Sequence, residues 1–205
     1  MRRTLPTLAL ATLFATAPLF AQQPTEQPKA EHPKEGSVND RREDQQQRIA
    51  NGVQSGQLTA GETKRLEARE ARVNQEIKTD RQANGGKLTP QERRRVNRQQ
   101  NRLSRSIYAD KHNSAQAHYG SNEVGRRREN QQDRIAQGIR SGQMTPGEAA
   151  RTENREQKIN RSIAADRAAN GGRLTAQERR NINQRQNSVS RQIYRQKHNT
   201  RVAPK

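Results

Sequence analysis

Apolar residues follow two different patterns along this chain. Residues 5–20 form a single apolar run without a charge, whereas the apolar residues beyond residue 38 are sparse and recur at helical spacing. Two stripes spaced by seven and four residues are Leu66, Val73 and Ile77, and Val96, Leu103 and Ile107. Such spacing places the members of each stripe on one face of a helix. The pattern therefore predicts long helices with narrow apolar faces.

Four helix starts are marked by the pattern Thr-x-x-Glu. The Thr hydroxyl can accept a hydrogen bond from the backbone N–H three residues on, while the Glu carboxylate reaches back to the Thr N–H. The four boxes open at Thr59, Thr89, Thr145 and Thr175. A polar run of about 20 residues without Gly or Pro follows each box, which suits a long helix. We expect helices over residues 40–53, 59–83 and 89–111, and the same order in the second half.

The second half of the chain repeats the first. Residues 41–113 recur at 127–199 with an offset of 86, and 43 of the 73 positions are identical. A weaker repeat with an offset of 30 lies within each unit, so the chain carries four versions of one loop-and-helix element. The predicted fold is all-α, with two homologous three-helix units. The expected segments are a signal peptide (1–21), a disordered tether (22–37), repeat unit 1 (38–113), a linker (114–122), repeat unit 2 (123–199) and a frayed tail (200–205).

The apolar stripes predict a thin core. Three aliphatic side chains per helix, each worth about 2 kcal/mol when buried, contribute roughly 6 kcal/mol. Ordering about 24 residues costs several times that amount before hydrogen bonds are counted, and no Cys is present to form a disulfide. We therefore expect an elongated or loosely packed bundle that a partner or a second copy would make rigid.

The N-terminal segment resembles a secretory signal peptide. Arg2 and Arg3 precede the apolar run, which is short, interrupted by Pro6 and Pro18, and followed by polar residues. Cleavage after Ala21 or at the earlier A-x-A site of residues 15–17 fits this layout. We expect a periplasmic or secreted protein with no transmembrane span after removal of the signal.

The charge balance is the strongest indication of a ligand. Removal of Arg2 and Arg3 with the signal leaves 38 basic residues against 21 acidic ones, a net charge of about +17 with neutral His. Such a charge favours an anionic polymer or envelope surface as the partner. The alternative is that the charge only keeps a poorly buried chain soluble.

Arg runs are the candidate contacts to such a polyanion. They could bind phosphates without reading sequence, so sequence-specific recognition of nucleic acid is not expected. Three tyrosines beyond the signal are also a poor stacking platform for single strands. The candidate residues are Arg93, Arg94, Arg95, Arg126, Arg127, Arg128, Arg179 and Arg180.

The loops before the four boxes resemble the EF-hand, a helix–loop–helix calcium motif with a 12-residue loop. If Glu62 closes the first loop, Gly56, Leu58 and Thr59 occupy its sixth, eighth and ninth places, and the other three loops repeat this match. The first, third and fifth places lack the usual set of oxygen ligands. The resemblance implies a structural or calcium-responsive interaction module, and the alternative is a set of turns followed by helix caps. The candidate metal ligands are Asp80, Asn84, Glu92, Asp166, Asn170 and Glu178.

The remaining candidate side chains do not indicate catalysis. Tyr108 and His112, like Tyr194 and His198, are four residues apart and could share a binding site, but a helix end is the favoured interpretation. No nucleophile signature or phosphate-binding glycine loop occurs in the sequence. We expect no carboxylate pair in an apolar setting, because many Glu residues have nearby Arg residues and are expected to form surface ion pairs. We predict a non-enzymatic protein without a cofactor. A scaffold whose stripes are completed by a protein partner is a third hypothesis.

Overall fold

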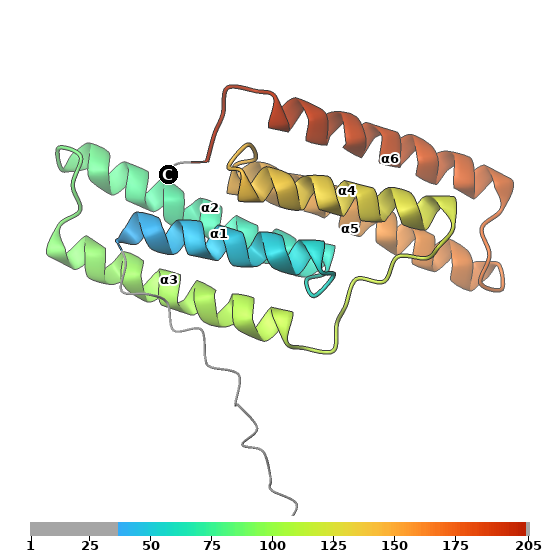
Figure 1. Cartoon of the computed structure of the whole chain (residues 1–205), viewed down its shortest axis with the longest axis horizontal. Helices are drawn as coiled ribbons and strands as arrows, with labels where there is room; N and C mark the ends of the chain where they lie inside the picture. The colour runs from blue at the N-terminus through green and yellow to red at the C-terminus, as the bar shows by residue number, and fades with distance from the viewer. Residues whose placement is uncertain (1–36, 204–205) are drawn as a thin grey trace, which may run out of the picture. The chain divides into compact units, whose positions relative to one another are not determined.

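The structure, a computed structural model, describes residues 37–203, and these form six helices (Figure 1). The signal segment and nearly all of the predicted tether lie outside the described residues. The helices are α1 (Val38–Gln54), α2 (Ala60–Ala83), α3 (Pro90–Lys111), α4 (Glu123–Arg140), α5 (Pro146–Ala169) and α6 (Ala176–Lys197). The all-helical fold is as predicted, and the predicted helix bounds of the first repeat agree within two residues.

Side-chain caps start these helices where the Thr-x-x-Glu pattern predicts. At α2 the Thr59 N–H donates to Glu62 Oε2 at 2.9 Å, and the Glu62 N–H donates to the Thr59 hydroxyl at 3.4 Å. The same reciprocal pair is present at α3, α5 and α6. Two further caps were not predicted. Ser37 and Asp40 form a capping box at the start of α1, and Asn122 caps α4 without a partner carboxylate.

The two repeats pack against each other as one body. Within each repeat the third helix lies on the first two, and the repeats meet where α1 packs on α4 and α2 packs on α5 (Figure 1). The contact between α2 and α5 is the most extensive of all. The six helices belong to one compact unit. Each repeat therefore packs its narrow apolar stripes in part against the other half of the same chain.

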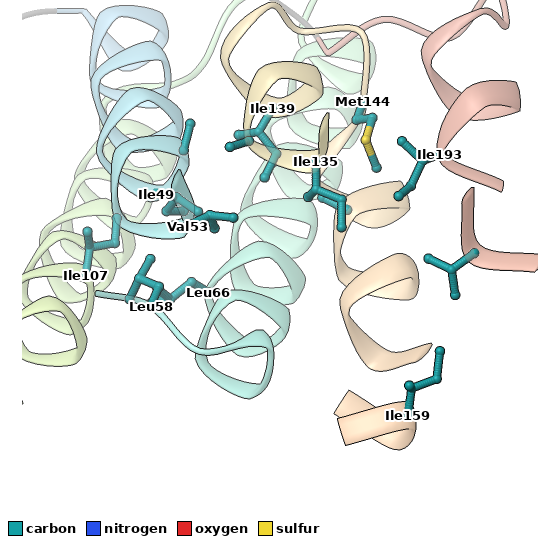
Figure 2. Packing of buried hydrophobic residues seen from close by; sticks show 14 of the residues in the cluster. Ile49, Val53, Leu58, Leu66, Ile107, Ile135, Ile139, Met144, Ile159 and Ile193 are labelled. Atoms are coloured by element: carbon teal, nitrogen blue, oxygen red, sulfur yellow. The ribbon is translucent and has the colours of Figure 1, made fainter. Parts of the chain in front are cut away.

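The main apolar core crosses the boundary between the repeats. Ile49 and Val53 of α1 lie in the same buried cluster as Ile135 and Ile139 of α4 (Figure 2). Full burial of an aliphatic side chain contributes about 1.5–3 kcal/mol. Because both repeats supply this cluster, they should unfold together rather than as separate domains.

Buried glutamines supplement the sparse apolar residues. In the first repeat the Gln45 side-chain amide donates to the Gln100 carbonyl at 2.7 Å and to the Ser104 hydroxyl at 2.8 Å. Gln131 makes the equivalent two bonds in the second repeat, at 2.7 and 2.9 Å. These hydrogen bonds offset the cost of burying the amide nitrogens. These amides therefore join the first helix of each repeat to the third in a fixed register.

Besides the capping residues Glu62 and Glu148, two pairs of glutamates are buried, which corrects the prediction that no carboxylate pair lies in an apolar setting. Glu67 and Glu70 of α2, and Glu153 and Glu156 of α5, are almost inaccessible. They are buried because they follow Leu66, or its buried equivalent Thr152, by one and four residues and so lie on the inward stripe. Burial raises the pKa of Glu70 and Glu156 to about 7, against the opposing pull of a nearby Arg, and it raises the pKa of Glu67 and Glu153 well above the usual range.

The segments that follow α3 and α6 return to their own repeat in the same way. The Ala117 N–H donates to the Gly56 carbonyl at 2.8 Å, and the Ala203 N–H donates to the Gly142 carbonyl at 2.8 Å. The tail was predicted to fray from residue 200, but the hydrogen bond from the Ala203 N–H to Gly142 anchors it to the second repeat. It is the counterpart of the bond from Ala117 to Gly56 in the first repeat.

Candidate anion-binding grooves

The excess positive charge is concentrated on two of the six helices. α3 carries seven basic residues against two acidic ones, and α6 carries six against one. By contrast, α2 carries six against five and α5 carries five against four. Among the described helices, α3 contacts only α1 and α2, and α6 contacts only α4 and α5. Each strongly basic helix therefore leaves its remaining surface free for a ligand.

A basic groove of about 710 Å³ runs between α2 and α3. Arg69 and Arg72 line its α2 wall, and Arg102 and Arg105 line its α3 wall. The Arg69 guanidinium donates to the Ser106 hydroxyl at 2.8 Å across the groove. The other three guanidinium groups are exposed and form no hydrogen bond or ion pair with another described residue. The groove therefore presents cations from both walls.

One carboxylate lines this groove, and it is already engaged. Glu76 forms an ion pair with Arg95, and it also accepts a hydrogen bond from the Gln99 side-chain amide at 2.7 Å. Arg95 also lies 2.9 Å from the Asp80 carboxylate. Because neighbouring cations and donors use Glu76 and Asp80, these acids do not cancel the charge of the Arg residues opposite.

The second repeat carries an equivalent groove between α5 and α6. It is smaller, about 250 Å³, and its cations are Arg155, Lys158 and Arg185. Arg185 donates to the Ser162 hydroxyl at 2.8 Å, and no carboxylate is among the residues that line this groove. The aliphatic side chains below the cations, Ile159 and Val189, are equivalent to Val73 and Leu103 of the first groove. The duplication therefore gives the protein two basic grooves.

Guanidinium groups suit this position chemically. An Arg side chain stays charged at all physiological pH values and presents five N–H donors in a planar fork that matches phosphate, sulfate or carboxylate oxygens. Because the side chains are exposed, they can bind such oxygens without first breaking a buried ion pair. The grooves are thus equipped to hold anionic groups in a row.

The predicted Arg runs are divided by the fold. Arg93, Arg94, Arg179 and Arg180 lie exposed at the N-terminal ends of α3 and α6, on the two most basic helices. Arg95 is held by Glu76 and Asp80, as described above. The run at α4 is occupied within the chain: Arg126 donates to the Ser121 carbonyl, Arg127 to the Asn187 side chain, and Arg128 lies over the Tyr119 ring at 5.2 Å.

The groove residues themselves were missed by sequence analysis, although a signal for them exists. They do not form runs, but on α2, α3 and α5 they stand in pairs three residues apart, which places each pair on one helix face. Knowing that they form a groove requires knowing which helices meet. The missed residues are Arg69, Arg72, Arg102, Arg105, Arg155, Lys158 and Arg185.

The loops that resemble EF-hands form turns closed by side-chain hydrogen bonds. The Asn84 amide nitrogen donates to both carboxylate oxygens of Glu92, at 3.0 and 2.9 Å, and the Thr89 N–H donates to the same carboxylate at 2.8 Å. The bond from Thr89 lowers the pKa of Glu92. Glu92 therefore works here as a cap, with an amide donor beside it.

The second repeat has the same arrangement, in which Asn170 donates to Glu178 at 2.9 and 3.1 Å and Asp166 accepts from Asn170 through its backbone carbonyl. Among the residues that the structure describes, no group of three or more His, Asp or Glu side chains is placed to hold a metal ion. The structure thus brings each predicted ligand trio together only in part.

No protein-family model, no curated protein and no solved structure matches this chain. None of the helices between residues 37 and 203 is long and apolar enough to cross a membrane.

Proposed function

We propose that this chain is an exported, non-enzymatic protein that binds a linear anionic polymer through the basic grooves of its two repeats. The observation that carries the proposal is the groove between α2 and α3, where four Arg side chains face each other across a floor of aliphatic residues. The equivalent groove of the second repeat supports it, since the duplication has kept cations there as well.

The groove shape favours a chain of anionic groups over a flat surface. A polymer strand can enter between two walls and meet cations on both sides, whereas a lipid headgroup layer touches only the rims. Each phosphate or sulfate that replaces its counterions with Arg contributes a salt-dependent share of the affinity. Recognition of this kind reads charge spacing rather than sequence.

Two grooves on one chain also favour a polymer over a small anion. When one groove has bound, the polymer is held near the second groove at a high effective concentration, so the combined affinity exceeds that of either groove. A monomeric anion gains nothing from the duplication.

The test is the affinity for labelled long-chain polyphosphate and for dextran sulfate at several salt concentrations. The variant Arg72→Glu/Arg102→Glu reverses two unpaired cations of the larger groove. The matched control is Arg151→Glu/Arg161→Glu, which makes the same change of charge at two exposed Arg residues of α5 that do not line either groove. We expect the groove variant to lose at least tenfold in affinity and the control to lose much less, since only the groove variant removes short-range contacts as well as charge.

The calcium hypothesis and the scaffold hypothesis remain predictions that are tested separately. The EF-hand resemblance would make the loops calcium-responsive, and calorimetry with calcium tests it separately from polyanion binding. A scaffold role would require a protein partner for a surface outside the grooves. Anionic vesicles should bind the protein less tightly than a polymer of equal charge density if the groove, rather than the outer surface, makes the contact.

A further inference from the structure

A single exposed stripe on α3 ends in an aromatic pair. Arg94, Arg98 and Arg105 stand at helical spacing with Tyr108 and His112, so all five side chains lie on one face. All of them are exposed, and the stripe includes no carboxylate. Arg105 also lines the groove between α2 and α3. The stripe is therefore continuous with the proposed binding site.

A similar stripe recurs on α6. Arg180 and Arg191 occupy the positions equivalent to Arg94 and Arg105, Gln184 stands in place of Arg98, and Tyr194 and His198 end the stripe. Each strongly basic helix thus finishes with the same aromatic pair on its exposed face, beside its cations.

Each tyrosine is already stacked on its histidine. The ring centroids of Tyr108 and His112 are 4.1 Å apart at an interplanar angle of 25°, and those of Tyr194 and His198 are 4.1 Å apart at 24°. The His Nδ1 lies 2.7 Å from the backbone carbonyl of its tyrosine in both pairs. This bond fixes the imidazole, which in turn fixes the orientation of the phenol ring.

The tyrosines are conspicuously exposed for aromatic residues. Tyr108 is 40% exposed and Tyr194 is 59% exposed, and Val202 is the one other large apolar residue exposed in the described part of the chain. The helix end explains the histidine, whose backbone N–H donates to carbonyls of the last turn. It does not explain the phenol ring, because that ring contributes little to the core. Exposed rings beside rows of Arg match the composition of a single-strand binding surface.

We propose that the exposed faces of α3 and α6 bind single-stranded nucleic acid, with Arg contacting the phosphates and each Tyr–His pair stacking on a base. This inference rests on the proposed polyanion binding and names the class of polymer. A single strand is required because a base in a duplex has no free face to offer to the ring. Recognition would not depend on sequence, since every base has a face that can stack.

The test compares two probes of equal charge. One is a labelled single-stranded oligothymidylate, and the other is an oligonucleotide of the same length whose nucleotides are all abasic. The wild-type chain and the double variant Tyr108→Ala/Tyr194→Ala are titrated with both. We expect the wild type to bind the oligothymidylate at least tenfold more tightly than the abasic strand, and the double variant to lose this preference while its affinity for the abasic strand is unchanged.

The outcomes separate the two proposals. Equal binding of both probes by the wild type would overturn the inference and leave polyanion binding standing, whereas binding of neither probe at low salt would overturn polyanion binding itself. The variant Tyr108→Phe/Tyr194→Phe should keep the preference, because it keeps the rings. An unchanged preference in the Ala variant would show that the rings do not stack on bases, and circular dichroism of each variant checks that the helices are intact.

Discussion

The buried glutamates predict that the fold loses stability as the pH rises through neutrality. Burial raises the pKa of Glu70 and of Glu156 to about 7 from 4.5, in spite of Arg42 and Arg128, which act in the opposite direction. Between pH 4.5 and about 7, each of these carboxyl groups is protonated in the folded chain and ionised in the unfolded chain. The free energy of unfolding therefore falls as the pH rises from about 4.5 through 7, and the contribution of these two groups levels off above that.

The magnitude follows from the size of the shift. Between about pH 5.5 and pH 8, each of the two carboxyl groups lowers the free energy of unfolding by about 2 kcal/mol, or about 4 kcal/mol together. Glu67 and Glu153 act in the same direction, because burial also raises their pKa.

Urea denaturation at both pH values measures this effect. The double variant Glu70→Gln/Glu156→Gln should lose about 4 kcal/mol of the pH dependence, since the amides are neutral at both pH values. Glu129→Gln changes an exposed carboxylate in α4 and should leave the pH dependence as it is. A wild-type stability that stays level or rises between the two pH values would refute the reasoning, as would full pH dependence in the double variant.

Three further predictions concern packing and caps. A Cβ at Gly125 would lie 1.7 Å from the Gly120 carbonyl oxygen, so Gly125→Ala should cost about 1–3 kcal/mol in thermal unfolding, whereas Gly147→Ala, with no atom closer than 3.5 Å, should be tolerated. Thr59→Ala removes a helix cap and should lower the free energy of unfolding, measured by urea denaturation, by about 1 kcal/mol. Ile135→Ala should cost about 2–5 kcal/mol and lower the single calorimetric transition of both repeats, and two separate transitions would contradict the shared core.

The helix starts could be predicted from sequence because a capping box is local. Thr59 and Glu62 are three residues apart and satisfy each other without help from the rest of the fold. The function of the loops was harder to predict, because the same local pattern is compatible with two structures. The residues around Gly86 fit both a metal loop and a capped turn, and the choice depends on whether Asn84, like its equivalent Asn170, turns an oxygen or an amide N–H toward the carboxylate.

The burial of Glu70 and the grooves could not be predicted because they depend on which helices meet. The stripe that carries Leu66 and Val73 is too narrow to specify a partner, and nearly the same stripe occurs in both repeats. Glu70 is buried beside Arg42 of α1, and packing of α3 on α2 brings Arg72 opposite Arg102. A count of tyrosines likewise could not show that two of them end equivalent basic stripes.

The slope of binding affinity against salt concentration tests the central claim most directly. It should be measured with long-chain polyphosphate for the wild type and for a variant in which Arg72, Arg102, Arg155 and Lys158 are all replaced by Gln. Binding through the grooves predicts a steep fall in affinity with salt for the wild type and a slope shallower by about 0.7 for each cation removed that contacts an anionic group. An identical slope in the two proteins, or a wild-type affinity that does not respond to salt, would contradict it.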